Sequence, residues 1–76
     1  MIKHIEVICK MTTYAKVIPL SIIWDNAKIY EIDKILEIKP IASTKGGGVG
    51  IRYKCKIRNK IRYLFLNDYL WWIELD

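Results

Sequence analysis

Residues 51–57 alternate strictly between apolar or aromatic side chains and cationic ones, in the order Ile-Arg-Tyr-Lys-Cys-Lys-Ile. This period of two is typical of a half-buried β-strand. A second apolar run at residues 61–66 follows the short link 58–60, so the stretch predicts a β-hairpin. Because successive side chains of a strand point to opposite faces, the sequence predicts two faces for the first strand: a core face of Tyr53, Cys55 and Ile57, and an outward face of Arg52, Lys54 and Lys56.

The hairpin has two possible registers. A three-residue loop pairs Ile57 with Ile61 and sets Lys56 beside Arg62, which gathers the cations of both strands into one patch. A two-residue turn pairs Ile57 with Lys60 instead. That register puts apolar and aromatic residues of the second strand on the cationic face, a poor burial pattern. We therefore predict the three-residue loop, which leaves three residues inside the core or facing it: Tyr53, Tyr63 and Phe65.

The remaining chain predicts further short strands and no helix. Strands are expected at residues 2–11, 16–24, 29–41 and 70–75, and the third of these should bulge or bend at Asp33–Lys34, where its apolar pattern changes phase. Pro19 lacks an amide proton, so its strand should be an edge or bulged there. The predicted core residues of the first two strands are Ile5, Val7, Cys9, Met11, Ile18, Leu20, Ile22 and Trp24.

These elements predict an all-β fold. Turns are expected at residues 25–28 and 67–69, where Asp and Asn favour local backbone bonding. Six or seven antiparallel strands in sequence order indicate a meander that closes into a small barrel. With 76 residues, the chain has room for one domain, residues 1–76.

Several segments share their spacing with a family of short Gram-positive bacterial proteins. They follow the pattern P-x-S-I-x-W, Y-x-I-D, A-S-x-K-x-G-G-x-G-x-R-Y-x-C, Y-L-F and W-[FW]-[IV]-E, here spanning Pro19 to Glu74. The chain resembles this family over nearly its whole length, and the resemblance implies an SH3-like barrel without implying an activity. One departure is Asn26-Ala27, where the relatives tend to have Asp-Gly or Asn-Gly.

Positive charge is concentrated in one segment. The net charge is +5, and residues 39–62 carry eight cations and no acid. The longest apolar run, residues 17–24, is too short to span a membrane. Glu6 and His4 stand where a signal peptide would need apolar residues, so we expect a cytoplasmic protein. Cys9 and Cys55 are expected to be reduced, buried thiols, and with one histidine they do not supply the four ligands of a zinc site.

The cationic row indicates a polyanion ligand. Side chains two apart on a strand repeat at about 6.6 Å, comparable to the phosphate spacing along a nucleic-acid strand. The alternative is a charged edge that prevents aggregation. Tyr69 and Trp72 are the candidate stacking or partner-contact residues, since Trp72 shares its parity with Glu74. The nucleic-acid-binding candidates are Lys45, Arg52, Lys54, Lys56, Arg58, Lys60 and Arg62.

Other chemistry has little support. The glycine loop at residues 45–50 lacks the G-x-x-x-x-G-K-[ST] order and following helix of a phosphate loop. Cys55 lies between two lysines but on the core side, which favours an inert thiol. We expect no catalytic residues, metal or cofactor, and a protein that binds nucleic acid or another polyanion. The alternative is a protein-interaction adaptor that uses its aromatic patch or a sheet edge; the sequence leaves the oligomeric state open.

Overall fold

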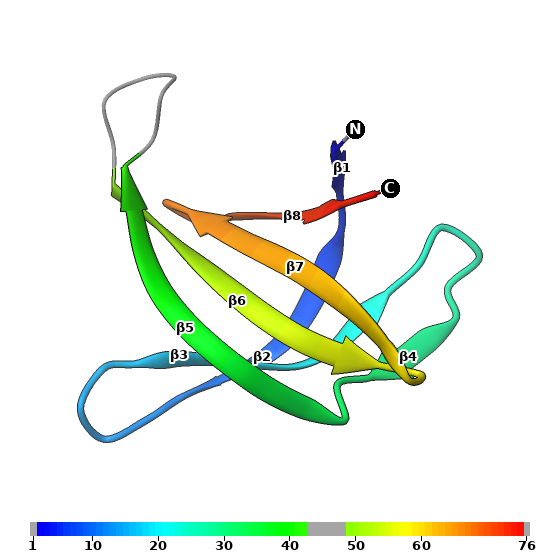
Figure 1. Ribbon diagram of the computed structural model, residues 1–76, viewed down its shortest axis with the longest axis horizontal. Coiled ribbons are helices and arrows are strands. Elements are labelled where there is room, and N and C mark those ends of the chain that lie inside the picture. Colours follow the sequence, from blue (N-terminus) through cyan, green and yellow to red (C-terminus); the bar gives the residue numbers. More distant parts are fainter. Residues whose placement is uncertain (1, 43–48, 76) are drawn as a thin grey trace.

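The computed structural model describes residues 2–42 and 49–75, where all regular structure is β-strand (Figure 1). Every strand pairing is antiparallel. The all-β prediction is confirmed. The predicted strand number is wrong, because two expected long strands are each interrupted. The strands are β1 (Ile2–His4), β2 (Glu6–Met11), β3 (Val17–Ile23), β4 (Ile29–Glu31), β5 (Lys34–Ala42), β6 (Val49–Ile57), β7 (Lys60–Asn67) and β8 (Leu70–Glu74).

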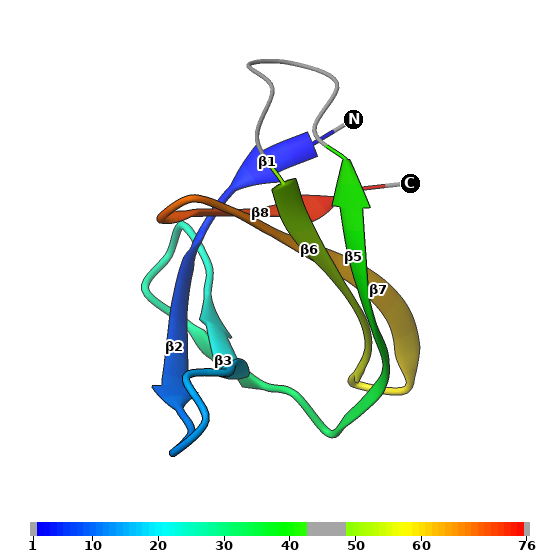
Figure 2. The same cartoon turned by 90° about the vertical axis from the view of Figure 1, so that its left-hand side faces the viewer.

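The strands form two sheets that surround a shared interior (Figure 2). One sheet has five strands in the order β1-β8-β7-β6-β5, and the other has three in the order β2-β3-β4. The predicted closed barrel is wrong for the described residues. Strand pairing does not continue all the way round the interior, because the strands of one sheet do not pair with those of the other.

Two corners connect the sheets. At the first, Ile5 separates β1 from β2, and its amide donates to the carbonyl of Trp71 in β8 (3.2 Å). At the second, the amide of Ile32 donates to Leu20 of the three-stranded sheet (2.9 Å), while the next amide, from Asp33, donates to Lys56 of the five-stranded sheet (2.8 Å). Strands that change sheet at such bends keep their backbone groups bonded. The bend predicted near Asp33–Lys34 is confirmed.

Tyr53 joins the two sheets through the core. Its side chain is 1% exposed, and its hydroxyl donates to the carbonyl of Val17 in β3 (2.6 Å). Its ring lies 5.4 Å from that of Trp71. A buried hydroxyl without such a partner would be costly. The core cluster around it consists of Ile22, Tyr53, Cys55, Ile57, Leu64 and Ile73.

The first two strands bury different residues from those predicted. Ile8 pairs with Ser21 but Cys9 pairs with Pro19, so Leu20 is the extra residue of a β-bulge. The bulge expected at Pro19 is confirmed, and it turns Pro19 inward and leaves Leu20 42% exposed. Cys9 and Met11 were also expected in the core and are exposed. Their end of the β2–β3 hairpin projects beyond the five-stranded sheet (Figure 1).

The β6–β7 hairpin has the register that the sequence disfavoured. Ile57 pairs with Lys60 across a two-residue turn, and Arg58 and Asn59 have φ of 49° and 66°. The predicted three-residue loop is therefore wrong. Positive φ at both central residues is the requirement of a type I′ turn, whose twist matches that of the flanking strands. Asn accepts this conformation more readily than most residues.

We predict that Tyr53→Phe lowers the free energy of unfolding by about 1–2 kcal/mol, since the Val17 carbonyl loses its partner while the ring stays packed. Urea denaturation measures this change. Tyr69→Phe is the matched control because that side chain is 96% exposed, and it should change stability by less than about 0.5 kcal/mol. Equal effects of the two substitutions would contradict the role assigned to the Tyr53 hydroxyl.

The turn makes a second prediction. Asn59→Gly should stabilise the protein by up to about 1 kcal/mol, and Asn59→Val should destabilise it by at least about 1 kcal/mol, because only the first relieves the positive φ. Lys60→Gly should destabilise, since Lys60 lies in a strand. A three-residue loop would reverse this pattern: Lys60→Gly would stabilise the protein and Asn59→Val would be tolerated. Urea unfolding of the three variants distinguishes the registers.

Candidate nucleic-acid interface

The outer face of the five-stranded sheet, meaning the side turned away from the core cluster, carries a continuous cross-strand row. Pairings connect His4 to Trp72, Trp72 to Phe65, Phe65 to Arg52, and Arg52 to Lys39. Directly paired residues share a face, so one residue from each of the five strands joins this row. The two-residue turn is what aligns cations with aromatic rings here.

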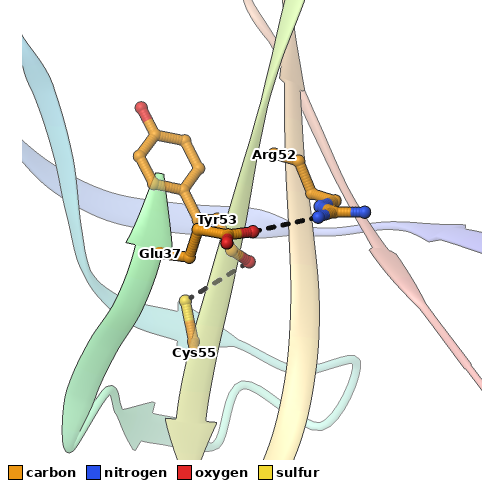
Figure 3. Close-up of polar contacts among 4 residues, drawn as sticks. All are labelled: Glu37, Arg52, Tyr53 and Cys55. Atoms are coloured by element: carbon orange, nitrogen blue, oxygen red, sulfur yellow. Dashed lines mark hydrogen bonds and ion pairs between the residues drawn. The ribbon is translucent and has the colours of Figure 1, made fainter. Parts of the chain in front are cut away.

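The three cations of β6 project together, as predicted. Arg52, Lys54 and Lys56 alternate with the buried Tyr53, Cys55 and Ile57. In Figure 3 the Arg52 side chain leaves β6 on the side opposite to Tyr53 and Cys55. Because β6 lies between β5 and β7, these cations do not protect a sheet edge, and the edge-protection alternative is wrong for them.

Arg52 differs from the two lysines in its contacts. Its Nη2 donates to Oε1 of Glu37 on β5 (3.0 Å; Figure 3). Its Cζ lies 5.1 Å from the centre of the Tyr63 ring. Its Nε is buried and has no hydrogen-bond partner among the described residues. In the described part of the chain, neither Lys54 nor Lys56 has an ion-pair partner. The lysines are therefore the cations available to a ligand, and Arg52 is already held in place.

The aromatic residues of this face form their own contacts. The rings of Phe65 and Trp72 are stacked, with centroids 4.1 Å apart and planes at 11°. Phe65 is 8% exposed yet lies outside the core cluster, so outer-face neighbours cover it. The predicted burial is confirmed for Tyr53 and Phe65, but the predicted face is wrong for Tyr63 and Phe65, which lie opposite Lys54 and Arg52. Trp72 is half-buried on the outer face, opposite in parity to Trp71 and Ile73 as expected.

Strand β5 adds two cations that sequence reasoning missed. Lys34 pairs directly with Lys56, and Lys39 pairs directly with Arg52. Like charges directly opposite each other are destabilising in a sheet. An anion bound over them would relieve that repulsion. Lys39 is two residues from Glu37 but Lys34 is three, so parity along the sequence puts them on opposite faces. The bulge at Leu36, which brings both to the same face opposite β6, was not visible in the sequence.

The other candidates lie elsewhere. Lys60 pairs with Ile57 and Arg62 with Cys55, which puts both on the inner side of the sheet, and Arg58 is in the turn. Lys60 and Arg62 do not extend the outer cationic row, because the shorter turn reverses their parity. Arg58 does not extend it either, since its guanidinium lies against the Tyr30 ring of β4. Tyr69 is 96% exposed in the β7–β8 turn. Lys45 lies outside the described residues.

The two cysteines are in contrasting environments. Cys9 is exposed, while Cys55 is fully buried and its Sγ lies 3.7 Å from the carbonyl of Tyr53. Burial raises the pKa of the Cys55 thiol to about 11, against the lowering that two flanking lysines would cause. The folded state thus keeps this proton to higher pH than the unfolded chain. Its contribution to stability is complete below about pH 9 and declines as the pH rises towards 11.

Within residues 2–42 and 49–75, no group of three or more His, Cys, Asp or Glu side chains is placed to hold a metal ion. No helix in that part of the chain is of the length and apolarity needed to cross a membrane. Comparisons with models of protein families, with curated proteins and with solved structures find no match. The resemblance to a Gram-positive family and to SH3-like barrels stays a prediction.

We predict that the two thiols differ sharply in reactivity. At pH 8 Cys9 should react with an aromatic disulfide reagent within minutes, while Cys55 stays protected by burial and by its raised pKa. Absorbance should report one thiol per folded chain and two in concentrated guanidinium chloride. Cys9→Ser should abolish the fast reaction, and Cys55→Ser should leave it unchanged. Two fast thiols in the folded protein would contradict the structure.

Proposed function

We propose that this protein is a non-enzymatic, cytoplasmic module that binds single-stranded nucleic acid on the outer face of its five-stranded sheet. The observation that carries the proposal is that unpaired lysines and stacked aromatic rings occupy the same face. Proteins that bind single strands combine a cationic track for the backbone with aromatic side chains for the bases.

The two kinds of side chain would divide the binding. Lys54 and Lys56 neutralise phosphates. Lys56 lies opposite Lys34, and an anion between them would relieve their repulsion, whereas Lys54 lies opposite Glu37. Arg52, held by Glu37 and Tyr63, lies directly opposite Phe65 and so joins the cationic row to the stacked rings. Trp72 has one ring face covered by Phe65, so a base would contact the rest of its exposed surface.

Single strands should bind better than duplexes, because only unpaired bases can contact aromatic side chains. Lysine contacts to phosphate carry no sequence information. Binding is therefore expected to depend weakly on sequence. RNA and DNA should both bind, since none of these contacts requires a 2′-hydroxyl.

A second candidate is a protein-interaction adaptor. β5 is an edge strand, and its Leu36 and Ile38 side chains are 42% and 49% exposed. An extended peptide could add to this edge through backbone hydrogen bonds. Lys34 and Lys39 on the same strand act against such pairing, and for that reason nucleic-acid binding is preferred. Binding at the edge would depend little on salt.

We predict that Lys54→Glu combined with Lys56→Glu lowers affinity for a labelled 12-nucleotide single strand at least about a hundredfold, because two phosphate contacts become repulsive. Fluorescence anisotropy measures the affinity, and circular dichroism checks the fold. Lys10→Glu with Lys16→Glu is the matched control, since both residues are exposed and belong to the β2–β3 hairpin region. It changes net charge equally but should alter affinity far less.

The salt dependence of the same titration gives an independent check. For three neutralised phosphates, log K should fall with log salt at a slope of about −2. Undiminished affinity in the outer-face variant would eliminate the proposal. So would an equal loss in both variants, which would mean attraction by net charge alone.

A further inference from the structure

A cavity opens between the two sheets, on the inner side of the β6–β7 hairpin. Its volume is about 450 Å³, within the range of small-molecule pockets. Ile22 of β3, Ile57 of β6 and Ile73 of β8 line it, and all three belong to the buried core cluster. The cavity therefore has an apolar floor built from both sheets.

Two aromatic residues form one wall. Trp24, which directly follows β3, and Tyr30 of β4 line the cavity, and both are partly buried against the core. The Cζ of Arg58 lies 5.5 Å from the centre of the Tyr30 ring, so the Arg58 side chain reaches from the β6–β7 turn to β4. The aromatic wall and the cationic turn thus meet at one end of the cavity.

Positive charge gathers at this end. Arg58, Lys60 and Arg62 line the cavity, and no carboxylate does among the described residues. Asp33, which lies between β4 and β5, accepts a hydrogen bond from the backbone amide of Arg58 (2.9 Å), and this bond occupies one of its oxygens. Lys28 adds a further cation on Tyr30, with Nζ 5.4 Å from the ring centre.

We propose that this cavity binds a small amphipathic carboxylate. Its apolar body would lie against the isoleucines, Trp24 and Tyr30, and its anionic head would meet Arg58 and Lys60. A pocket with apolar walls and a few convergent charged groups matches this ligand class in shape and charge. The site is separate from the outer face, because β7 turns Lys60 and Arg62 to the opposite side of the sheet from Tyr63.

Decanoate tests the proposal on the full chain, with 1-decanol as its uncharged counterpart and 2-naphthoate as an aromatic carboxylate. Binding is followed by NMR shifts of the Trp24 indole and of the isoleucine methyl groups. The charge-removing variant is Arg58→Gln with Lys60→Gln. Its matched control, Lys54→Gln with Lys56→Gln, removes the same charge from the outer face.

Decanoate should bind at least about ten times more tightly than decanol and shift the Trp24 indole signal. The Arg58→Gln, Lys60→Gln variant should lose about tenfold or more in carboxylate affinity, with decanol binding unchanged. The control should bind decanoate normally. Tighter binding of decanoate than of 2-naphthoate would mean that the ligand has an aliphatic body, and the reverse order would mean an aromatic one.

Three results would overturn the proposal: no saturable carboxylate binding below millimolar concentration, equal affinity for decanoate and decanol, or equal losses in the two variants. Its failure is distinguishable from that of nucleic-acid binding. The oligonucleotide should be sensitive to Lys54→Gln with Lys56→Gln, and insensitive to Arg58→Gln with Lys60→Gln.

Discussion

The two-residue turn at Arg58–Asn59 sets which side chains share a face of this protein. Positive φ at both residues pairs Ile57 with Lys60, and every later pair of the hairpin follows from that one. Because side chains alternate along a strand, a shift of one residue would move the whole of β7 to the other face. The observed register places Tyr63 and Phe65 on the same face as the cations of β6, and Lys60 and Arg62 on the inner face of the sheet.

Burial works with this register rather than against it. On the inner side, Leu64 is fully buried opposite Tyr53, whose hydroxyl reaches the other sheet. On the outer side, Phe65 avoids exposure by stacking on Trp72. Both faces of β7 are thus partly covered, which removes the penalty that made this register unfavourable on sequence grounds. The same register leaves cations on both faces of the hairpin, with Lys54 and Lys56 on the outer face and Lys60 and Arg62 on the inner face.

Local patterns predicted much of the fold, and long-range pairings account for what they missed. The alternation in residues 51–57 was sufficient to predict β6 and its two faces, and the phase change at Asp33–Lys34 was sufficient to predict a bend. The interruption at Ile5 depends on a hydrogen bond to Trp71 of β8, far along the chain, and the bulge at Leu36 depends on pairing with β6. No short window of the sequence contains either contact. For the candidate site, the cationic row was predictable from parity. The presence of Tyr63 and Phe65 on the same face was not predictable, because it depends on the positive φ of Arg58 and Asn59.

Cross-strand NMR contacts in the β6–β7 hairpin test this account most directly. The observed register predicts backbone proton contacts between Lys54 and Tyr63 and between Arg52 and Phe65. It also predicts contacts between the Phe65 and Trp72 rings. Contacts that join Lys54 to Leu64 and Ile57 to Ile61 would mean a three-residue loop. In that case the aromatic rings would leave the cationic face, and the basis for the proposed binding surface would be lost.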